Sequence, residues 1–174
     1  MPTLRLASMA DLPALKAMMA RAIAELQTDF LAPAQVEASK AVMGLDTQLI
    51  VDGGYFLAEI DNALAGCGGW SRRATLYGGD HSAGRDARLL DPAIEPARIR
   101  AMYTNPDFTR RGVGRAVLGA CEDAARAAGF VRVELMATLS GVPLYTAAGF
   151  NPIERIVDSN GGVPVPLIRM GKAL

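Results

Sequence analysis

Two glycines and three arginines lie together near the middle of the chain, in the run Arg110-Arg111-Gly112-Val113-Gly114-Arg115. An apolar stripe at helical spacing follows this run, formed by Val117, Leu118, Cys121, Ala124, Ala125 and Ala128. Glycines at the start of a helix let the backbone approach a ligand closely. The free N–H groups and the positive end of the helix dipole then favour an anion. This turn therefore predicts a binding site for a ligand that carries phosphate.

The common phosphate-binding motifs do not fit this turn. A P-loop requires Gly-x-x-x-x-Gly-Lys-Ser/Thr, and the chain contains no such sequence. A dinucleotide-binding turn requires Gly-x-Gly-x-x-Gly, but Gly112 and Gly114 are followed by Val117 at the third glycine position. The turn must therefore belong to another class of phosphate site.

The segments around the turn predict the elements that position it. Arg98–Thr104 is short and ends at Asn105-Pro106, which is typical of a strand stopped by a turn. Gly129 follows the apolar stripe at the place where a helix favours a left-handed cap. Val131–Leu135 alternates apolar and polar residues, as a strand does. The predicted order is strand, basic glycine turn, helix and strand.

The run Thr109–Gly114 resembles the acyl-coenzyme A signature of the GNAT-type (GCN5-related) N-acetyltransferase superfamily, Arg/Gln-x-x-Gly-x-Gly/Ala between a strand and a helix. Thr109 takes the first place, where the family prefers Gln or Arg. About thirty residues further on, Tyr145–Phe150 matches the family's Tyr-x-x-x-Gly-Phe motif. Thr138 stands where the family often carries Asn. The two motifs in this order around one helix make the resemblance specific.

The resemblance implies one N-acetyltransferase domain over residues 1–174. The implied fold is α/β, with a mixed, largely antiparallel central sheet and helices on both faces. That sheet is expected to be splayed open between the strands at Arg98–Thr104 and Val131–Leu135.

The implied activity is transfer of the acetyl group of acetyl-coenzyme A to a primary amine of a small molecule or peptide. The backbone N–H groups expected to face the pyrophosphate are those of Arg110, Arg111, Gly112, Val113, Gly114 and Arg115. Side chains of Arg110, Arg111 or Arg115 could add charge-assisted contacts. The backbone groups expected to hold the pantetheine arm and polarise the acetyl carbonyl are those of Met102, Tyr103 and Thr104.

Tyr145 is the candidate general acid. A phenol can donate a proton to the departing thiolate if the two groups come within hydrogen-bond reach. The competing interpretation is a half-buried tyrosine that packs beside Phe150.

The sequence does not identify a general base. Arg98 stands near the place where some relatives carry a glutamate. Glu95 and His81 are alternatives, and many relatives use water and no dedicated base. For the same reason a second function stays open, namely a non-catalytic acyl-coenzyme A binding or regulatory module of the same fold. The acceptor is not identified. The oligomeric state stays open, with a homodimer suggested by analogy alone.

The composition limits the kinds of molecule that the protein is expected to bind. The 174-residue chain is 51% hydrophobic, with 18 Lys+Arg and 18 Asp+Glu, so neither nucleic-acid nor membrane binding is expected. Cys67 and Cys121 are expected to be buried free thiols, which suits a cytoplasmic protein. One histidine and no Cys/His cluster argue against a metal site.

The rest of the chain predicts two further helices and five further strands. Helices are expected over Leu12–Leu26 and Pro33–Met43, and Leu49–Gly54 is ambiguous. The remaining strands are expected at Leu4–Leu6, Tyr55–Ile60, Ala63–Ser71, Phe150–Val157 and Val163–Met170. Pro164 and Pro166 suggest that the last strand lies at an edge. The segment 72–97 is long and irregular, and its role is open.

Overall fold

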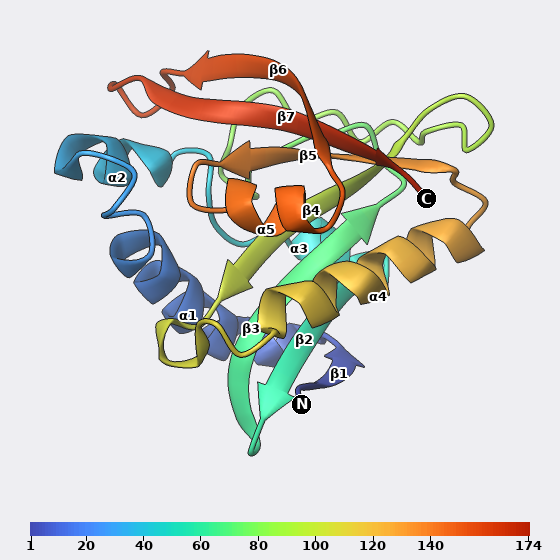
Figure 1. The fold of residues 1–174 in the computed structure, drawn as a ribbon, viewed down its shortest axis with the longest axis horizontal. Coiled ribbons are helices and arrows are strands. Elements are labelled where there is room, and N and C mark those ends of the chain that lie inside the picture. The colour runs from blue at the N-terminus through green and yellow to red at the C-terminus, as the bar shows by residue number, and fades with distance from the viewer.

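The computed structural model describes residues 1–174 and contains one seven-stranded sheet with helices on both faces (Figure 1). The strands are β1 (Thr3–Leu6), β2 (Tyr55–Ile60), β3 (Ala63–Ser71), β4 (Ala97–Thr104), β5 (Arg132–Thr138), β6 (Asn151–Asp158) and β7 (Val165–Ala173). The helices are α1 (Leu12–Glu25), α2 (Pro33–Ser39), α3 (Thr47–Val51), α4 (Val113–Ala127) and α5 (Val142–Ala147). Short 3₁₀ turns occur at Met9–Asp11 and Pro106–Phe108.

The strand order is β1-β2-β3-β4-β5-β7-β6. Every neighbouring pair is antiparallel except β4 and β5, which are parallel. The expected mixed, largely antiparallel sheet is therefore confirmed. None of the helices combines the length and the apolar character that a membrane-spanning helix requires.

Two cores cover the two faces of the sheet. On one face the apolar stripe of α4, including Val117, Leu118 and Cys121, packs on β2, β3 and β4. On the other face Leu15 and Met19 of α1 pack with α3 and with side chains of β2, β3 and β4. Figure 1 shows α1 and α4 on opposite sides of β3 and β4. Both cysteines are buried and free, as expected.

The glycines of β3 allow α4 to press closely on the sheet. A Cβ atom on Gly66 would lie 2.5 Å from Val113 Cγ1, and one on Gly68 would lie 2.8 Å from Val117 Cγ1. The start of α4 therefore rests almost on the backbone of β3. Glycines within a strand often mark a bulge or a close approach, and both occur here.

The bulge lies in β4, opposite Gly68. Gly69 pairs with Arg100 and Cys67 pairs with Tyr103, so β4 has one residue more than β3 in this interval. Ala101 accommodates the extra residue with a left-handed φ of 50°. Such a conformation is unfavourable for alanine, so the surrounding structure must impose it. The Tyr55 hydroxyl contributes by donating a hydrogen bond of 3.0 Å to the Ala101 carbonyl.

β4 and β5 separate soon after they meet. They pair only at Ala97↔Val133 and Arg98↔Glu134, although β5 continues to Thr138. Figure 1 shows the two arrows diverging from this point. The edge of β4 that faces β5 therefore has no strand partner beyond Arg98. The splayed sheet that the resemblance implied is confirmed.

Two expectations about the outer elements need correction, and one ambiguous stretch is now assigned. β7 is not an edge strand, because it lies between β5 and β6. β5 pairs with β7 only from Leu167 onward, so Pro164 and Pro166 lie at the start of the strand, before this pairing begins. No backbone N–H is needed there for a hydrogen bond to β5. The second helix ends at Ser39 instead of Met43. The ambiguous stretch, Leu49–Gly54, begins within α3, which Asp46 caps by accepting a hydrogen bond from the Gln48 N–H.

Candidate active site

The glycine turn and the start of α4 form the predicted cradle, Arg110–Arg115. Arg110 and Gly112 have left-handed φ values of 62° and 78°, and α4 begins at Val113 with Gly112 as its N-cap. No side chain caps this helix start. The first N–H groups of α4 therefore remain available to an anion, with the helix dipole behind them.

The three arginines of the cradle are exposed and make no ion pair with the chain. The Arg111 guanidinium lies over the Phe108 ring, 5.2 Å from its centroid. Most other charged side chains of the molecule are paired, including Arg126 at the far end of α4. The cradle thus concentrates free positive charge beside free backbone donors, a combination that suits phosphate.

The turn that leads from β4 into the cradle is held at both sides. The Asn105 side chain accepts a hydrogen bond from the Asp107 N–H at 3.1 Å and donates one to the Leu64 carbonyl at 2.8 Å. Arg21 of α1 pairs with Asp107 at 2.9 Å. These contacts fix the direction in which the chain leaves β4.

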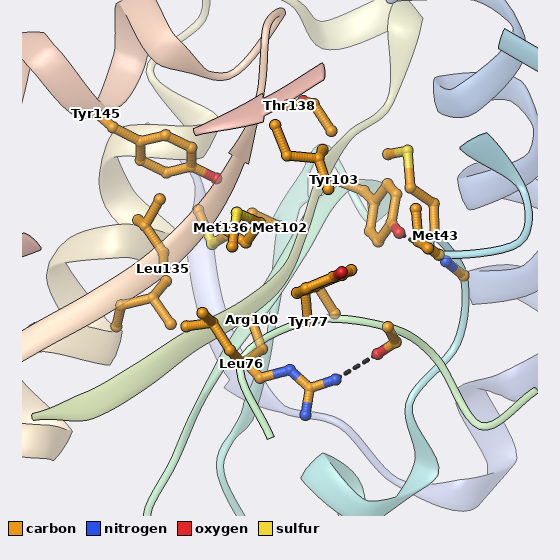
Figure 2. Close-up of a pocket in the computed structure, with 16 residues that line it drawn as sticks. Met43, Leu76, Tyr77, Arg100, Met102, Tyr103, Leu135, Met136, Thr138 and Tyr145 are labelled. Atoms are coloured by element: carbon orange, nitrogen blue, oxygen red, sulfur yellow. Dashed lines mark hydrogen bonds between the residues drawn. The ribbon is translucent and has the colours of Figure 1, made fainter. Parts of the chain in front are cut away.

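A cavity occupies the gap between the splayed strands (Figure 2). Its lining residues are Val42, Met43, Gly44, Leu76, Tyr77, Gly78, Ile99, Arg100, Ala101, Met102, Tyr103, Leu135, Met136, Thr138, Tyr145 and Leu167. Met102 and Tyr103 of the predicted site therefore line the cavity. Thr104 lies beyond it toward the cradle, with its Oγ1 3.8 Å from the place a Cβ on Gly114 would take.

Tyr145 reaches the cavity from α5. Its side chain is 8% exposed and packs edge-on against Phe150, with 5.9 Å between the ring centroids. Gly141 leaves room for the ring, since a Cβ there would lie 2.8 Å from Tyr145 Cε2. The hydroxyl makes no hydrogen bond within the chain and points toward the cavity in Figure 2. Burial raises the pKa of Tyr145 above that of an ordinary phenol, so the hydroxyl stays protonated.

The two sequence motifs touch each other. A Cβ on Gly114 would lie 2.9 Å from Leu144 Cδ2, so α5 packs directly on the first turn of α4. The second glycine of the cradle is thus required for packing as well as for backbone access. Through this contact the cradle and the Tyr145 hydroxyl have a fixed relative position.

Two further tyrosines line the cavity, and the hydroxyl of each is hydrogen-bonded within the chain. The Tyr103 hydroxyl accepts a hydrogen bond of 2.8 Å from the Gly44 N–H. The Tyr77 hydroxyl donates one of 2.9 Å to Asp158, and burial together with this carboxylate raises the pKa of Tyr77 to about 12. Tyr145 is the one tyrosine of the three whose hydroxyl has no partner in the chain.

The candidate bases lie outside the cavity. Glu95 pairs with Arg88 at 2.9 Å and accepts the Asp91 N–H, and these contacts lower the pKa of Glu95 to about 2. His81 Nε2 lies 2.7 Å from the Lys40 carbonyl, in a separate pocket beside α1. Arg98 pairs with Glu134 at 3.1 Å. The structure also gathers no group of three or more His, Cys, Asp or Glu side chains suited to a metal ion.

Sequence reasoning missed a buried charge cluster beside the cavity. Arg100 of β4 is 5% exposed and lies 2.8 Å from Asp46, which is fully buried. Arg85 pairs with the other Asp46 oxygen at 2.9 Å. The three residues come from distant parts of the chain, so no local motif joins them. The one visible signal was a pair of arginines inside an otherwise apolar strand.

The splayed sheet, the cradle and the cavity together define the acyl-CoA N-acyltransferase fold. The sequence profile of the Acetyltransferase (GNAT) family matches residues 20–150. The chain therefore belongs to this acetyltransferase family. Among curated protein sequences, no significant match is found.

Solved structures support the same fold over the whole chain. A GCN5-related N-acetyltransferase from Rhodopseudomonas palustris aligns with a TM-score of 0.73 and 20% identity, covering 99% of this chain and 96% of the other. The PaiA N-acetyltransferase from Thermoplasma acidophilum, in complex with coenzyme A, aligns at 0.68 and 14% identity over 100% and 99%. The yncA protein of Salmonella typhimurium, with its cofactor acetyl-CoA, aligns at 0.64 and 18% over 100% and 94%.

Proposed function

We propose that this protein transfers the acetyl group of acetyl-coenzyme A to a primary amine by direct attack, with Tyr145 as the general acid. The observation that carries the proposal is the cavity between β4 and β5. It opens the β4 backbone to a ligand, and a protonated, unpartnered phenol stands in its wall.

The cradle fits the proposed cosubstrate. Its backbone donors and three unpaired arginines suit the pyrophosphate, and the open edge of β4 at Met102, Tyr103 and Thr104 offers backbone groups to an extended arm. Acetyl-coenzyme A supplies the acetyl group as a thioester. Two of the similar structures named above contain coenzyme A or acetyl-CoA, which supports this choice of cosubstrate.

Tyr145 suits the acid role because the same interior affects both partners of the proton transfer. Burial raises the pKa of the Cys67 thiol, in the core on the α1 face of the sheet, to about 12, which illustrates how basic a thiolate becomes when this protein excludes water from it. A departing thiolate in the cavity is basic for the same reason. Transfer of the Tyr145 proton to that thiolate is then much less unfavourable than the raised phenol pKa alone suggests.

No Asp, Glu or His side chain lines the cavity. Removal of the ammonium proton is therefore assigned to water. The residues that remain to contact the acceptor are the apolar side chains of the cavity wall, the two hydrogen-bonded tyrosines and Arg100. This arrangement supports catalysis by positioning and by the acid, without a dedicated base.

Thermal unfolding tests the cosubstrate. A ligand that binds the folded state alone stabilises it by about 2.7 kcal/mol at a hundred times its dissociation constant. We expect acetyl-coenzyme A to raise the midpoint, and ATP and NAD to leave it unchanged. A rise of the midpoint with ATP or NAD, and none with acetyl-coenzyme A, would overturn the proposal and favour a nucleotide site at the cradle.

A pair of tyrosine variants tests the acid. We expect Tyr145→Phe to lower turnover at least a hundred-fold while acetyl-coenzyme A affinity is kept. Tyr77→Phe removes another hydroxyl of the same cavity, one bound to Asp158, and should cost much less. Unchanged turnover in Tyr145→Phe would show that Tyr145 has a packing role. Acetyl-coenzyme A binding with no turnover of any amine would favour the non-catalytic module.

A further inference from the structure

Arg100 is the one ionised side chain among the residues that line the cavity. The other members are apolar residues, glycines, three tyrosines and Thr138, and none is Asp or Glu. Figure 2 places Arg100 and Tyr145 on opposite sides of the cavity. If the thiolate departs beside Tyr145, the acceptor molecule lies on the Arg100 side.

The Arg100 guanidinium is rigidly held yet incompletely used. Its Nη2 donates to the Gly78 carbonyl and lies 2.8 Å from Asp46 Oδ2. Its Nη1 and Nε make no hydrogen bond within the chain. An arginine carries five N–H donors, so a planar set of donors remains for a ligand. Neither Nε nor Nη1 is sealed from solvent, so a ligand that enters the cavity can reach these donors.

The surroundings leave this wall positive. Asp46 neutralises one charge, but two guanidiniums, those of Arg100 and Arg85, share it. Two further carboxylates lie near this wall. Asp158 is buried behind Tyr77, and its oxygens accept hydrogen bonds from the Tyr77 hydroxyl and from Asn160. Asp80 is exposed and accepts the Thr47 N–H. Asp80 therefore lies on the solvent side of the cluster, where water screens its charge. Seen from the cavity, the cluster presents a cation.

An acceptor must match this charge. A purely cationic amine would lose water beside a like charge and find no carboxylate to pair with, which is costly. A carboxylate would instead complete the guanidinium with charge-assisted hydrogen bonds. The positive charge would also favour the neutral, nucleophilic form of a nearby amine, in a cavity that has no base of its own.

We propose that the acceptor carries a carboxylate as well as its amine, and that Arg100 binds this carboxylate while the apolar wall takes the rest of the molecule. The inference rests on the proposed acetyl transfer and names the substrate class for it. Arg100 is then a residue that determines specificity. Polyamines and other acceptors without an anionic group are excluded.

Binding of matched product analogues tests the charge preference without turnover. The protein is first saturated with coenzyme A, and then titrated by calorimetry with N-acetyl-leucine and with N-acetyl-leucinamide. The two ligands differ only in carboxylate against carboxamide. We expect the acid to bind about ten- to a hundred-fold more tightly, the factor typical of a buried charged hydrogen bond. Equal affinities, or no binding of either ligand, would overturn the inference.

The rate of acetylation of different amines provides a second test of the charge preference. With acetyl-coenzyme A, leucine should be acetylated with a higher kcat/KM than leucinamide or spermidine, although leucinamide has the larger neutral amine fraction at pH 7.5. Faster acetylation of spermidine or leucinamide would overturn the inference and leave the acetyltransferase proposal intact. Absence of any acetyl-coenzyme A binding would instead remove the acetyltransferase proposal.

Variants on one strand locate the effect. Arg100→Met should abolish the preference for acid over amide, and Arg100→Lys should keep part of it. Arg98→Met is the matched control, because Arg98 is also ion-paired on β4 but does not line the cavity. It should retain the preference. If Arg100→Met does not fold, Arg100→Lys and the two wild-type titrations still decide the matter. A preference that survives in Arg100→Lys and Arg100→Met at full strength would contradict the assignment to Arg100.

Discussion

The two ends of the cavity are built in different ways. The proposed donor half, made of the cradle, the end of β4 from Met102 to Thr104 and α5, comes from one continuous part of the chain and uses backbone groups and exposed arginines. The proposed acceptor half comes from segments 42–44 and 76–78, backed by the buried cluster of Arg100, Asp46 and Arg85. The donor half depends on local backbone geometry, and the acceptor half depends on long-range pairing of buried charges.

This difference predicts which half tolerates change. Backbone donors survive most side-chain substitutions, and exposed charges contribute little to stability. A buried charge that loses its partner is strongly destabilising. The acceptor half should therefore be the more fragile in stability, and the donor half the more sensitive in ligand affinity.

Asp46→Ala should have the largest effect on stability. It removes the carboxylate between Arg100 and Arg85, leaving two cations at a fully buried position, and should cost about 3–5 kcal/mol of unfolding free energy. Urea denaturation followed by circular dichroism measures this loss. Asp123→Ala, which breaks an exposed pair with Arg126, is the control and should cost about 0.5 kcal/mol or less. A loss below about 1 kcal/mol for Asp46→Ala would contradict the proposed fragility of the acceptor half.

Alkaline pH should destabilise the fold as a whole. Burial raises the pKa of Cys67 from 9.0 to about 12, and it raises the pKa of Tyr103 and Tyr145 above that of an ordinary phenol. The unfolded chain then loses these protons first, so stability is complete below about pH 9 and falls as the pH rises further. Each group contributes a slope of about 1.4 kcal/mol per pH unit within its own interval.

Urea titrations at pH 8, 9 and 10 check this prediction. Cys67→Ala should reduce the slope between pH 9 and 10, because the thiol is the first of these groups to ionise in the unfolded chain. A constant unfolding free energy across the three pH values would refute the prediction.

The donor half could be predicted from sequence because its signals are local. Gly112 adopts a left-handed φ of 78°, and Gly129, with a φ of 91°, follows the end of α4. Each feature depends on a residue and its nearest neighbours. The order of these features around one helix then sufficed to predict the splayed sheet.

The acceptor half could not be predicted because its determinants are not local. Nothing near Asp46 in the sequence indicates that two arginines, 39 and 54 residues further along, converge on it. Strand order failed for the same reason. Pro164 and Pro166 correctly indicated missing donors, but whether β5 extends beside them depends on where a distant strand ends. The sequence therefore predicted the local property of these two prolines correctly and the position of β7 in the sheet incorrectly.

Gly112→Ala should have an intermediate effect, and it tests the backbone character of the donor half. A Cβ at Gly112 meets nothing within 4 Å, so the cost comes from the left-handed φ of 78° alone, about 1 kcal/mol. Acetyl-coenzyme A affinity should fall several-fold as the turn relaxes. Gly119→Ala is the control, because Gly119 also has open space but lies within α4. It should stabilise the protein by about 0.5–1 kcal/mol. Equal effects of the two substitutions would show that the conformation of the turn is unimportant.

Arg111→Gln should have the smallest effect and the strongest salt dependence. Arg111 is exposed near the positive end of α4, so its contribution to phosphate binding is about 0.3–1 kcal/mol at low salt, a two- to five-fold loss of acetyl-coenzyme A affinity. Screening should nearly abolish the loss in 0.5 M NaCl, since the Debye length there is only about 4 Å. Arg126→Gln, at the opposite end of the helix, should leave the affinity unchanged at both salt concentrations. The buried Arg100 is screened far less, so its preference for the acid analogue should persist in the same high salt. If the effects of Arg111 and Arg100 decline together as salt is added, the distinction between an exposed donor half and a buried acceptor half is wrong.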